Sequence, residues 1–333
     1  MTKIGGEGSF RTAIVMHEKR NKRILEGFFV RILSFLIFFS ILINPIAAFA
    51  EETKDRSFAE LRQGLEELLE LVKVLEKENL SLKQENLRLL KITEQGVAKQ
   101  VPVLLYHHLY DGDLDKSPYK GNGAVVSVDS FREQMKYLKD NGFYTATLED
   151  LERFLAKEID LPAKTVVITF DDGYYSNIEY AYPILKEYGQ KATIFVVGKG
   201  VENATSETNM SSTLRSLGYE DIKNTSDVFE FHSHTYDLHK QINNMPALTV
   251  LSKEEILVDL NRIKEQLGTK YLAYPFGGYN ENTIEVLKEL NYKLAFTVKE
   301  GYASPNSEKY EIPRIIVWPS TNIERFKQIV NPR

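Results

Sequence analysis

The sequence of residues 97–333 predicts an α/β fold, in which a mainly parallel sheet with outer helices curls into a barrel. Three observations predict it. Apolar runs of strand length alternate with segments of helical periodicity, as in chains of βαβ units. The length of about 235 residues suits a single domain of barrel size. The most distinctive polar residues follow strand runs directly, and the C-terminal ends of barrel strands form one rim.

The expected elements follow in order along this domain. Apolar, β-branched runs predict strands near 101–106, 143–147, 165–170, 192–198, 229–233, 270–275, 293–298 and 312–318. Apolar side chains spaced three to four residues apart predict helices near 130–140, 148–157, 178–188, 252–267 and 281–290. Residues 199–227 are rich in Asn, Ser and Thr, so we expect a long loop or a small subdomain there.

Residues 1–50 have the layout of a secretory signal. Basic residues precede an apolar run over 32–43, and Ala48-Phe49-Ala50 offers a small-x-small cleavage site. The run is shorter than the roughly 20 residues that a membrane helix needs, so we expect cleavage after Ala50. An uncleaved membrane anchor stays open, as does a start at Met16. In either case the positive-inside rule places the remaining chain outside the cytoplasm, secreted or anchored at the cell envelope.

Composition excludes several classes of partner and chemistry. Residues 1–50 hold seven Lys and Arg against three Asp and Glu, so the remaining chain would carry a formal charge of −9 instead of −5. An acidic chain argues against nucleic acid and anionic lipid as partners. The chain has no cysteine, which excludes disulfides, thiolate metal ligands and thiol nucleophiles.

Residues 51–96 are predicted to form a coiled-coil stalk and linker, with the short linker over residues 93–100. Leucine recurs every seven residues at the d positions Leu61, Leu68, Leu75, Leu82 and Leu89. The a positions between them hold Leu65, Val72, Asn79 and Asn86. Leu at d with Asn at a favours a parallel dimer of fixed register, so we expect a homodimer through residues 58–92. The alternative is an amphipathic helix that packs on its own catalytic domain.

Two adjacent carboxylates, Asp171 and Asp172, follow the strand run 165–170, and a glycine comes next. Both cannot stay ionised side by side unless a nearby positive charge compensates, and a divalent metal would do so. One carboxylate could then bind the metal while the other acts as a base. The alternative is an ordinary Asp-Asp-Gly surface turn.

Histidines cluster downstream of this pair. The chain has six, and His232, His234 and His239 fall within eight residues. Neutral imidazole is the commonest protein ligand for metals of the zinc type, so the cluster predicts a metal site. Another apolar strand run ends in His107-His108, which a barrel would place at the functional rim.

The segment Thr169-Phe170-Asp171-Asp172-Gly173-Tyr174 resembles the first motif of the polysaccharide deacetylases, the NodB-like carbohydrate esterase family 4. The resemblance implies a distorted (β/α) barrel in which Asp171 is the general base and Asp172 a metal ligand. The segment from His234 to His239 is similar to the branch that deacetylates poly-N-acetylglucosamine of biofilm exopolysaccharide. On that match His234 and His239 complete the ligand set, and His107 is the general acid.

The third family motif resembles Tyr274-Pro275-Phe276-Gly277, but Ala273 stands where the family usually has an arginine. Arg314 is the candidate substitute, because an arginine beside Asp171 would keep that carboxylate ionised. The alternative for Arg314 is a solvated charge at a strand end.

The resemblance implies hydrolysis of an N-acetyl group into acetate and a glucosamine unit, with the N–H of Phe276 as oxyanion donor. The divalent metal is expected to be zinc, and the donor set also suits cobalt, nickel or iron. Four aromatic residues could stack on sugar rings or else belong to the core: Tyr174, Tyr274, Phe276 and Trp318.

Other functions remain open at this stage. The acetylated substrate could be peptidoglycan, a chitin oligomer or xylan instead of an exopolysaccharide. The chain could also be an inactive, tethered glycan-binding or scaffold protein. The intact set of Asp171, Asp172, His234 and His239 argues against inactivity, since an inactive barrel has no need of a costly carboxylate pair.

Overall fold

A parallel sheet forms the centre of the folded chain in a computed structural model, which describes residues 54–204 and 214–332. The chain divides into two units, Met1–Leu82 and Lys83–Arg333. The predicted signal or anchor at residues 1–50 lies outside the described residues. Among the described residues, no helix has both the length and the apolar character that crossing a membrane requires.

The sheet of the second unit has eight strands, all paired in parallel, in the order β11-β10-β7-β6-β5-β1-β12, with β4 beside the first half of β5. Its strands are β1 (Val103–Tyr106), β4 (Tyr144–Thr145), β5 (Thr165–Phe170), β6 (Ala192–Val196), β7 (Phe229–Ser233), β10 (Tyr271–Ala273), β11 (Leu294–Phe296) and β12 (Ile315–Ile316). Each lies inside one of the eight strand runs expected from the sequence.

The sheet curls into a half-barrel instead of a regular closed barrel. Its two edge strands, β11 and β12, are not paired with each other. A single bridge from Phe296 to Ile312 crosses from β11 to the segment that precedes β12. The predicted distorted (β/α) barrel is therefore confirmed as a curled parallel sheet with helices.

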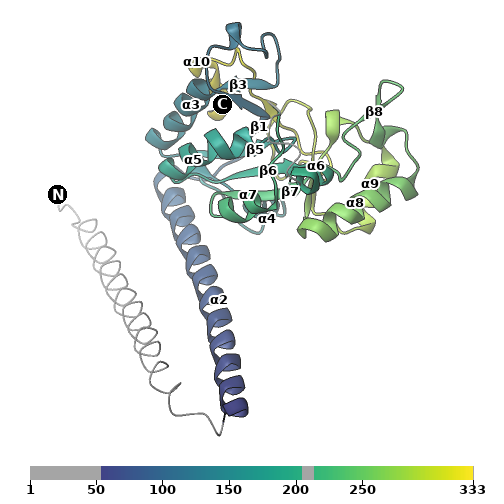
Figure 1. The fold of residues 1–333 in the computed structure, drawn as a ribbon. Coiled ribbons are helices and arrows are strands. Elements are labelled where there is room, and N and C mark those ends of the chain that lie inside the picture. The colour runs from purple at the N-terminus through teal and green to yellow at the C-terminus, as the bar shows by residue number, and fades with distance from the viewer. Residues whose placement is uncertain (1–53, 205–213, 333) are drawn as a thin grey trace, which may run out of the picture. The chain divides into compact units, whose positions relative to one another are not determined.

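Helices surround the sheet, and Figure 1 shows α3 and α5 on one side of the central strands and α8 and α9 near the other end. The helices of this unit are α3 (Val128–Asp140), α4 (Leu148–Leu155), α5 (Tyr182–Tyr188), α6 (Gly198–Ala204), α7 (Tyr219–Thr225), α8 (Lys253–Leu267), α9 (Glu281–Glu289) and α10 (Ile323–Val330). A π-helical turn at Asn177–Ala181 leads into α5. Short strands form two further pairs: β2 (His108–Tyr110) with β3 (Val125–Ser127), and β8 (Gln241–Ile242) with β9 (Met245–Pro246).

Neighbouring residues of the central strands face opposite sides, so their side chains enter two different core clusters. Leu104, Ile168 and Ile194 pack with the outer helices α3 and α5. Val103, Val167 and Phe195 pack in a second cluster that includes α4. Because both faces of these strands are buried, the strands read as continuous apolar runs.

The last residues of α2 (Lys54–Gln95) belong to the second unit and contact the rest of it through polar side chains. Arg88 is buried, and its guanidinium contacts Glu85 and the carbonyl of Asp160. Lys91 and Gln95 both donate to the carbonyl of Gly142. The helix thus continues three residues into the segment expected to be a linker.

The loops after β1, β5, β7 and β10 meet at one edge of the sheet, because parallel strands end on the same side. Asp171 follows β5, His234 follows β7 and Pro275 follows closely after β10. The side chains singled out in the sequence therefore gather at the C-terminal rim.

Candidate active site

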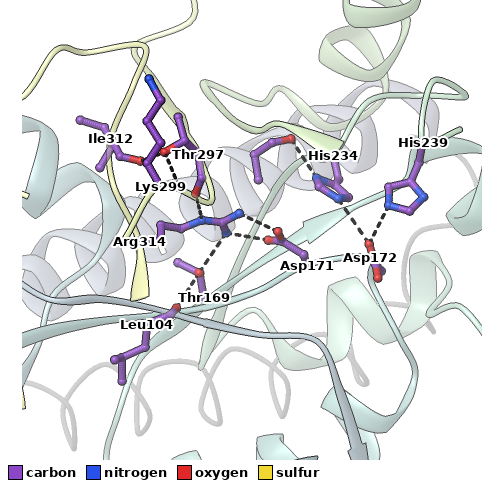
Figure 2. Close-up of polar contacts among 11 residues, drawn as sticks. Leu104, Thr169, Asp171, Asp172, His234, His239, Thr297, Lys299, Ile312 and Arg314 are labelled. Carbon is purple, nitrogen blue, oxygen red and sulfur yellow. Dashed lines mark hydrogen bonds and ion pairs between the residues drawn. The ribbon is translucent and has the colours of Figure 1, made fainter. Parts of the chain in front are cut away.

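A buried ion pair joins Asp171 to Arg314 at this rim (Figure 2). The guanidinium donates from Nη1 to Oδ1 over 2.8 Å and from Nη2 to Oδ2 over 2.6 Å. Asp171 is 3% exposed and Arg314 is fully buried. Burial alone would raise the pKa of Asp171, but the Arg314 guanidinium, together with His234 and His107, holds the pKa below its ordinary value.

Further hydrogen bonds fix the guanidinium in place. Nε of Arg314 donates to the carbonyl of Thr297 over 2.9 Å, and Nη1 also reaches Oγ1 of Thr169. The Thr169 hydroxyl in turn donates to the carbonyl of Leu104. Arg314 is therefore not a solvated strand-end charge. It occupies the role of charge partner that the family motif would otherwise assign to position 273.

The second carboxylate, Asp172, turns toward two histidines. Its Oδ1 lies 3.3 Å from Nε2 of His234 and 3.1 Å from Nε2 of His239. One ligand atom from each of the three residues can be chosen so that all lie within 4.8 Å of one another. Burial raises the pKa of Asp172, but its contacts with both imidazoles hold the pKa well below its ordinary value.

The chemistry of these donors fits a metal ion. Nδ1 of His234 lies 2.8 Å from the carbonyl of Ala273, which can only accept, so Nδ1 carries the proton. In the neutral ring Nε2 then carries the lone pair and faces a carboxylate oxygen, a pairing that becomes favourable when a proton or a metal cation lies between the two atoms. A backbone carbonyl on the outer nitrogen is the usual support of a metal-binding histidine.

Three residues at the site have an unusual backbone conformation. Asp172, Thr235 and Phe276 all have left-handed backbone angles, with φ of 73°, 71° and 56°. Such angles are uncommon outside glycine and persist where the surrounding structure enforces them, often at functional sites. The Phe276 ring lies against His239, with ring centroids 4.7 Å apart.

His107 follows β1 and lies near the carboxylates. The pairing of Tyr106 with Phe170 continues through a hydrogen bond from the Asp171 N–H to the Tyr106 carbonyl, which brings His107 beside Asp171. Burial lowers the pKa of His107, and the negative charges of Asp171 and Asp172 only partly oppose this.

The four aromatic residues expected at the substrate divide into three environments. Phe276 and Trp318 are 46% and 48% exposed, so their rings are accessible. Tyr174 is half-buried beside His108, and burial, with a further contribution from the nearby Asp172, raises the pKa of its hydroxyl. Tyr274 is fully buried, stacked on Tyr279. Its ring has no face open to a glycan, so the expectation that Tyr274 stacks on sugar was wrong.

Sequence reasoning missed one charged residue beside the site. Asp259 of α8 is 8% exposed and accepts hydrogen bonds from the loop between His234 and His239. A signal for it existed, because Asp259 shares the buried face of α8 with Ile256, Leu260 and Ile263. A carboxylate on the apolar face of a helix needs hydrogen-bond partners.

Comparison with known proteins identifies the family that the sequence motifs resemble. The polysaccharide deacetylase family model matches residues 158–295. A poly-beta-1,6-N-acetyl-D-glucosamine N-deacetylase from Staphylococcus aureus is 33% identical over 201 residues, which are 58% of this chain and 67% of the relative.

Solved structures agree in fold. The Streptococcus pyogenes deacetylase PplD, solved in complex with acetate, is 31% identical with a TM-score of 0.59, over 70% of this chain and 99% of that one. IcaB from Ammonifex degensii is 28% identical with a TM-score of 0.59, over 72% of this chain and 99% of that one. The chain therefore belongs to the polysaccharide deacetylases, the NodB-like enzymes of carbohydrate esterase family 4.

Proposed function

We propose that this chain is a metal-dependent hydrolase that removes N-acetyl groups from an extracellular polysaccharide containing N-acetylglucosamine. The main support for the proposal is that the two adjacent carboxylates have different partners. Asp171 is paired with a buried arginine, whereas Asp172 faces the Nε2 atoms of His234 and His239. Each carboxylate thus has the surroundings that its own role requires.

Asp172, His234 and His239 would hold the metal, with zinc as the first choice. Two imidazoles and one carboxylate also suit cobalt, nickel or iron. A divalent metal bound there would supply Lewis acidity toward the acetyl carbonyl and toward water.

Asp171 acts as the general base and accepts a proton from the attacking water. Arg314 occupies one lone pair on each Asp171 oxygen, and a carboxylate oxygen has a second lone pair for the proton. The hydroxyl adds to the acetyl carbon. The N–H of Phe276, by analogy with the family, donates to the oxygen that becomes negative.

His107 gives a proton to the glucosamine nitrogen as the carbon–nitrogen bond breaks, so acetate and a free amine leave. Since burial lowers the pKa of His107, only the protonated fraction is competent at neutral pH. The exposed rings of Phe276 and Trp318 and the half-buried ring of Tyr174 would contact the sugar units on either side.

The proposed substrate follows from the relative whose name is poly-beta-1,6-N-acetyl-D-glucosamine N-deacetylase. The extracytoplasmic location follows from the signal-like composition of residues 1–50 alone. We propose that the chain has no nucleic-acid partner. It would be attached to a membrane only if residues 1–50 are retained.

The homodimer through residues 58–92 remains part of the proposal, and the attachment of α2 supports it. Arg88, Lys91 and Gln95 occupy heptad positions c and f, away from the a and d seam. Leu89 at d is 48% exposed. The domain therefore contacts the polar face at the end of α2. Leu89, in the a and d seam, remains exposed and can pack against a second copy of the helix.

Acetate release by the full chain tests the proposed function. β-1,6-linked N-acetylglucosamine oligomers, chitin oligomers, peptidoglycan and acetylated xylan would be compared after chelation and again after zinc is restored. The proposal expects zinc-dependent release that is fastest from the β-1,6-linked oligomers. Preferential release from another polymer would change the substrate, and no release from any polymer would support the inactive glycan-binding alternative.

A further inference from the structure

The distance between the two histidine ligands depends on the four residues that separate them. His234 follows β7 directly, and His239 comes after the loop Thr235–Leu238. Thr235 has a left-handed backbone, with φ of 71°, so the loop turns sharply at its first residue. Such a backbone angle persists only where surrounding contacts enforce it.

Two of the four loop N–H groups are satisfied close by in the sequence. The Thr235 N–H donates to Oγ of Ser233 over 3.1 Å. The Leu238 N–H donates to Oγ1 of Thr235 over 3.2 Å. These bonds close the ends of the loop but do not attach its middle to the domain.

A single carboxylate satisfies the other two N–H groups. Tyr236 donates to Oδ1 of Asp259 over 2.8 Å, and Asp237 donates to Oδ2 over 2.7 Å. Asp259 lies on α8, more than twenty residues later in the chain. Both oxygens are therefore used, one for each of two consecutive N–H groups. The N–H groups of Gly198 and Lys199 donate to the carbonyls of Thr235 and Tyr236, so Asp259 and these two donors together hold the loop in place.

Desolvation of the Asp259 carboxylate is unfavourable, because this residue is only 8% exposed and lies on the buried face of α8. Burial raises its pKa, and the two N–H donors oppose that rise by stabilising the ionised form. A helix that only needed to pack would carry an apolar residue at this position.

We propose that Asp259 is a positioning residue that sets the spacing of His234 and His239 and thereby the affinity of the metal site. This inference rests on the proposed function, since it presupposes that the two histidines bind metal. Removing an outer contact that orients metal ligands typically weakens metal binding by about 10–100-fold.

Zinc affinity of the full chain, measured by competition with a chromophoric chelator, tests the proposal. Asp259→Asn places an amide NH₂ against one of the two N–H donors, so it disrupts the loop at nearly constant size. We expect its zinc dissociation constant to rise about 10–100-fold. Glu265→Gln is the matched control, because it removes the same charge from α8 at an exposed residue that accepts from Asn261.

A second variant separates positioning from simple destabilisation. Asp259→Glu keeps the charge and both acceptors but displaces them by one methylene, so we expect a smaller loss of zinc affinity than in Asp259→Asn. Melting temperatures of the metal-free proteins report folding separately. If the folded Asn and Glu variants bind zinc as tightly as Glu265→Gln, whatever their melting temperatures, the proposal is wrong.

The same experiment distinguishes this failure from failure of the proposed function. His239→Ala serves as the reference for loss of a ligand. If the unmodified chain binds no zinc, or if His239→Ala binds it equally well, the metal site is misassigned and the role of Asp259 falls with it.

Discussion

Arg314 and Asp171 stand 143 positions apart in the sequence, yet they form a buried two-pronged ion pair with N···O distances of 2.8 and 2.6 Å. The pair gives Asp171 a permanent positive neighbour at a site where a second carboxylate follows immediately. It therefore explains how two adjacent carboxylates can both be ionised.

Breaking the ion pair should affect stability and the pH dependence together. Arg314→Gln leaves a buried carboxylate without its partner, which typically costs about 3–5 kcal/mol of unfolding free energy. It also raises the pKa of Asp171, so the acid limb of kcat/KM should move to higher pH. Urea denaturation and a pH–rate profile measure the two effects.

The double variant Arg314→Gln with Asp171→Asn is the control for the ion pair. It removes both charges and should recover much of the lost stability while releasing no acetate. A double variant that is as unstable as Arg314→Gln alone would mean that the arginine stabilises the fold through other contacts.

The two neighbouring histidines at the end of β1 should behave differently. His107→Gln should lower kcat by about 10²–10⁴-fold, the usual contribution of a general acid, and leave the zinc content unchanged. His108→Gln is the matched control, because His108 pairs through Nδ1 with Ser176. Equal loss of kcat in both variants would argue against a specific acid role for His107.

His108 should also make the protein sensitive to acid. It is buried, its Nε2 has no hydrogen-bond partner, and burial lowers its pKa to about 4. His108 therefore becomes protonated near pH 6.5 in the unfolded chain, but only near pH 4 in the folded chain. The contribution of His108 to the unfolding free energy is retained above pH 6.5. It falls by up to about 1.4 kcal/mol per pH unit as the pH is lowered from 6.5 to 4.

Urea denaturation at pH 7 and pH 4.5 measures this sensitivity. His108→Gln cannot take up the proton, so it should lose less unfolding free energy between the two pH values than the unmodified chain. Equal losses would show that His108 does not contribute to the acid sensitivity.

The exposed aromatic rings should contribute to substrate binding more than to catalysis. Phe276→Ala and Trp318→Ala should raise KM several-fold with little change in kcat, since the proposed backbone donor at 276 remains. Tyr274→Phe is the control: it removes a buried hydroxyl that donates to the Tyr310 carbonyl. This change should lower the melting temperature by a few degrees and leave KM unchanged.

Cysteine cross-linking can test the dimer without background, because the chain has no cysteine. Leu75→Cys places a thiol at a d position, where a parallel in-register partner brings the same residue within disulfide distance. Lys77→Cys, at an f position of the same turn, should not form a disulfide cross-link under mild oxidation. Non-reducing electrophoresis of the full chain measures both. Absence of a Leu75→Cys dimer, or equal cross-linking of both variants, would contradict the predicted seam.

Local patterns in the sequence predicted the strands and the carboxylate pair well. The run 165–170 became β5, and Asp171 and Asp172 follow it at the rim. Sheet closure could not be predicted in the same way. The run 312–318 is largely buried, but only Ile315–Ile316 forms a strand, and Ile312 makes a single bridge to Phe296 of β11. Burial of a segment can be predicted from its apolar composition, whereas strand pairing depends on the backbone of a segment far away in the sequence.

Contacts between distant residues were the least predictable part of the site. Arg314 could equally have been a solvated charge, since nothing near it in sequence records the position of Asp171. Tyr274 was misassigned because an aromatic residue beside a motif can face either the cleft or the core. Helix α10 was not predicted, although its buried residues Phe326, Ile329 and Val330 have helical spacing.

The separate roles of the two adjacent carboxylates are most directly tested by measuring bound zinc and acetate release on the same samples of Asp171→Asn and Asp172→Asn. The account predicts that Asp171→Asn keeps its zinc and loses acetate release, whereas Asp172→Asn loses both. If Asp171→Asn still releases acetate, or if Asp172→Asn binds zinc as tightly as the unmodified chain, the assignment of base and ligand is wrong.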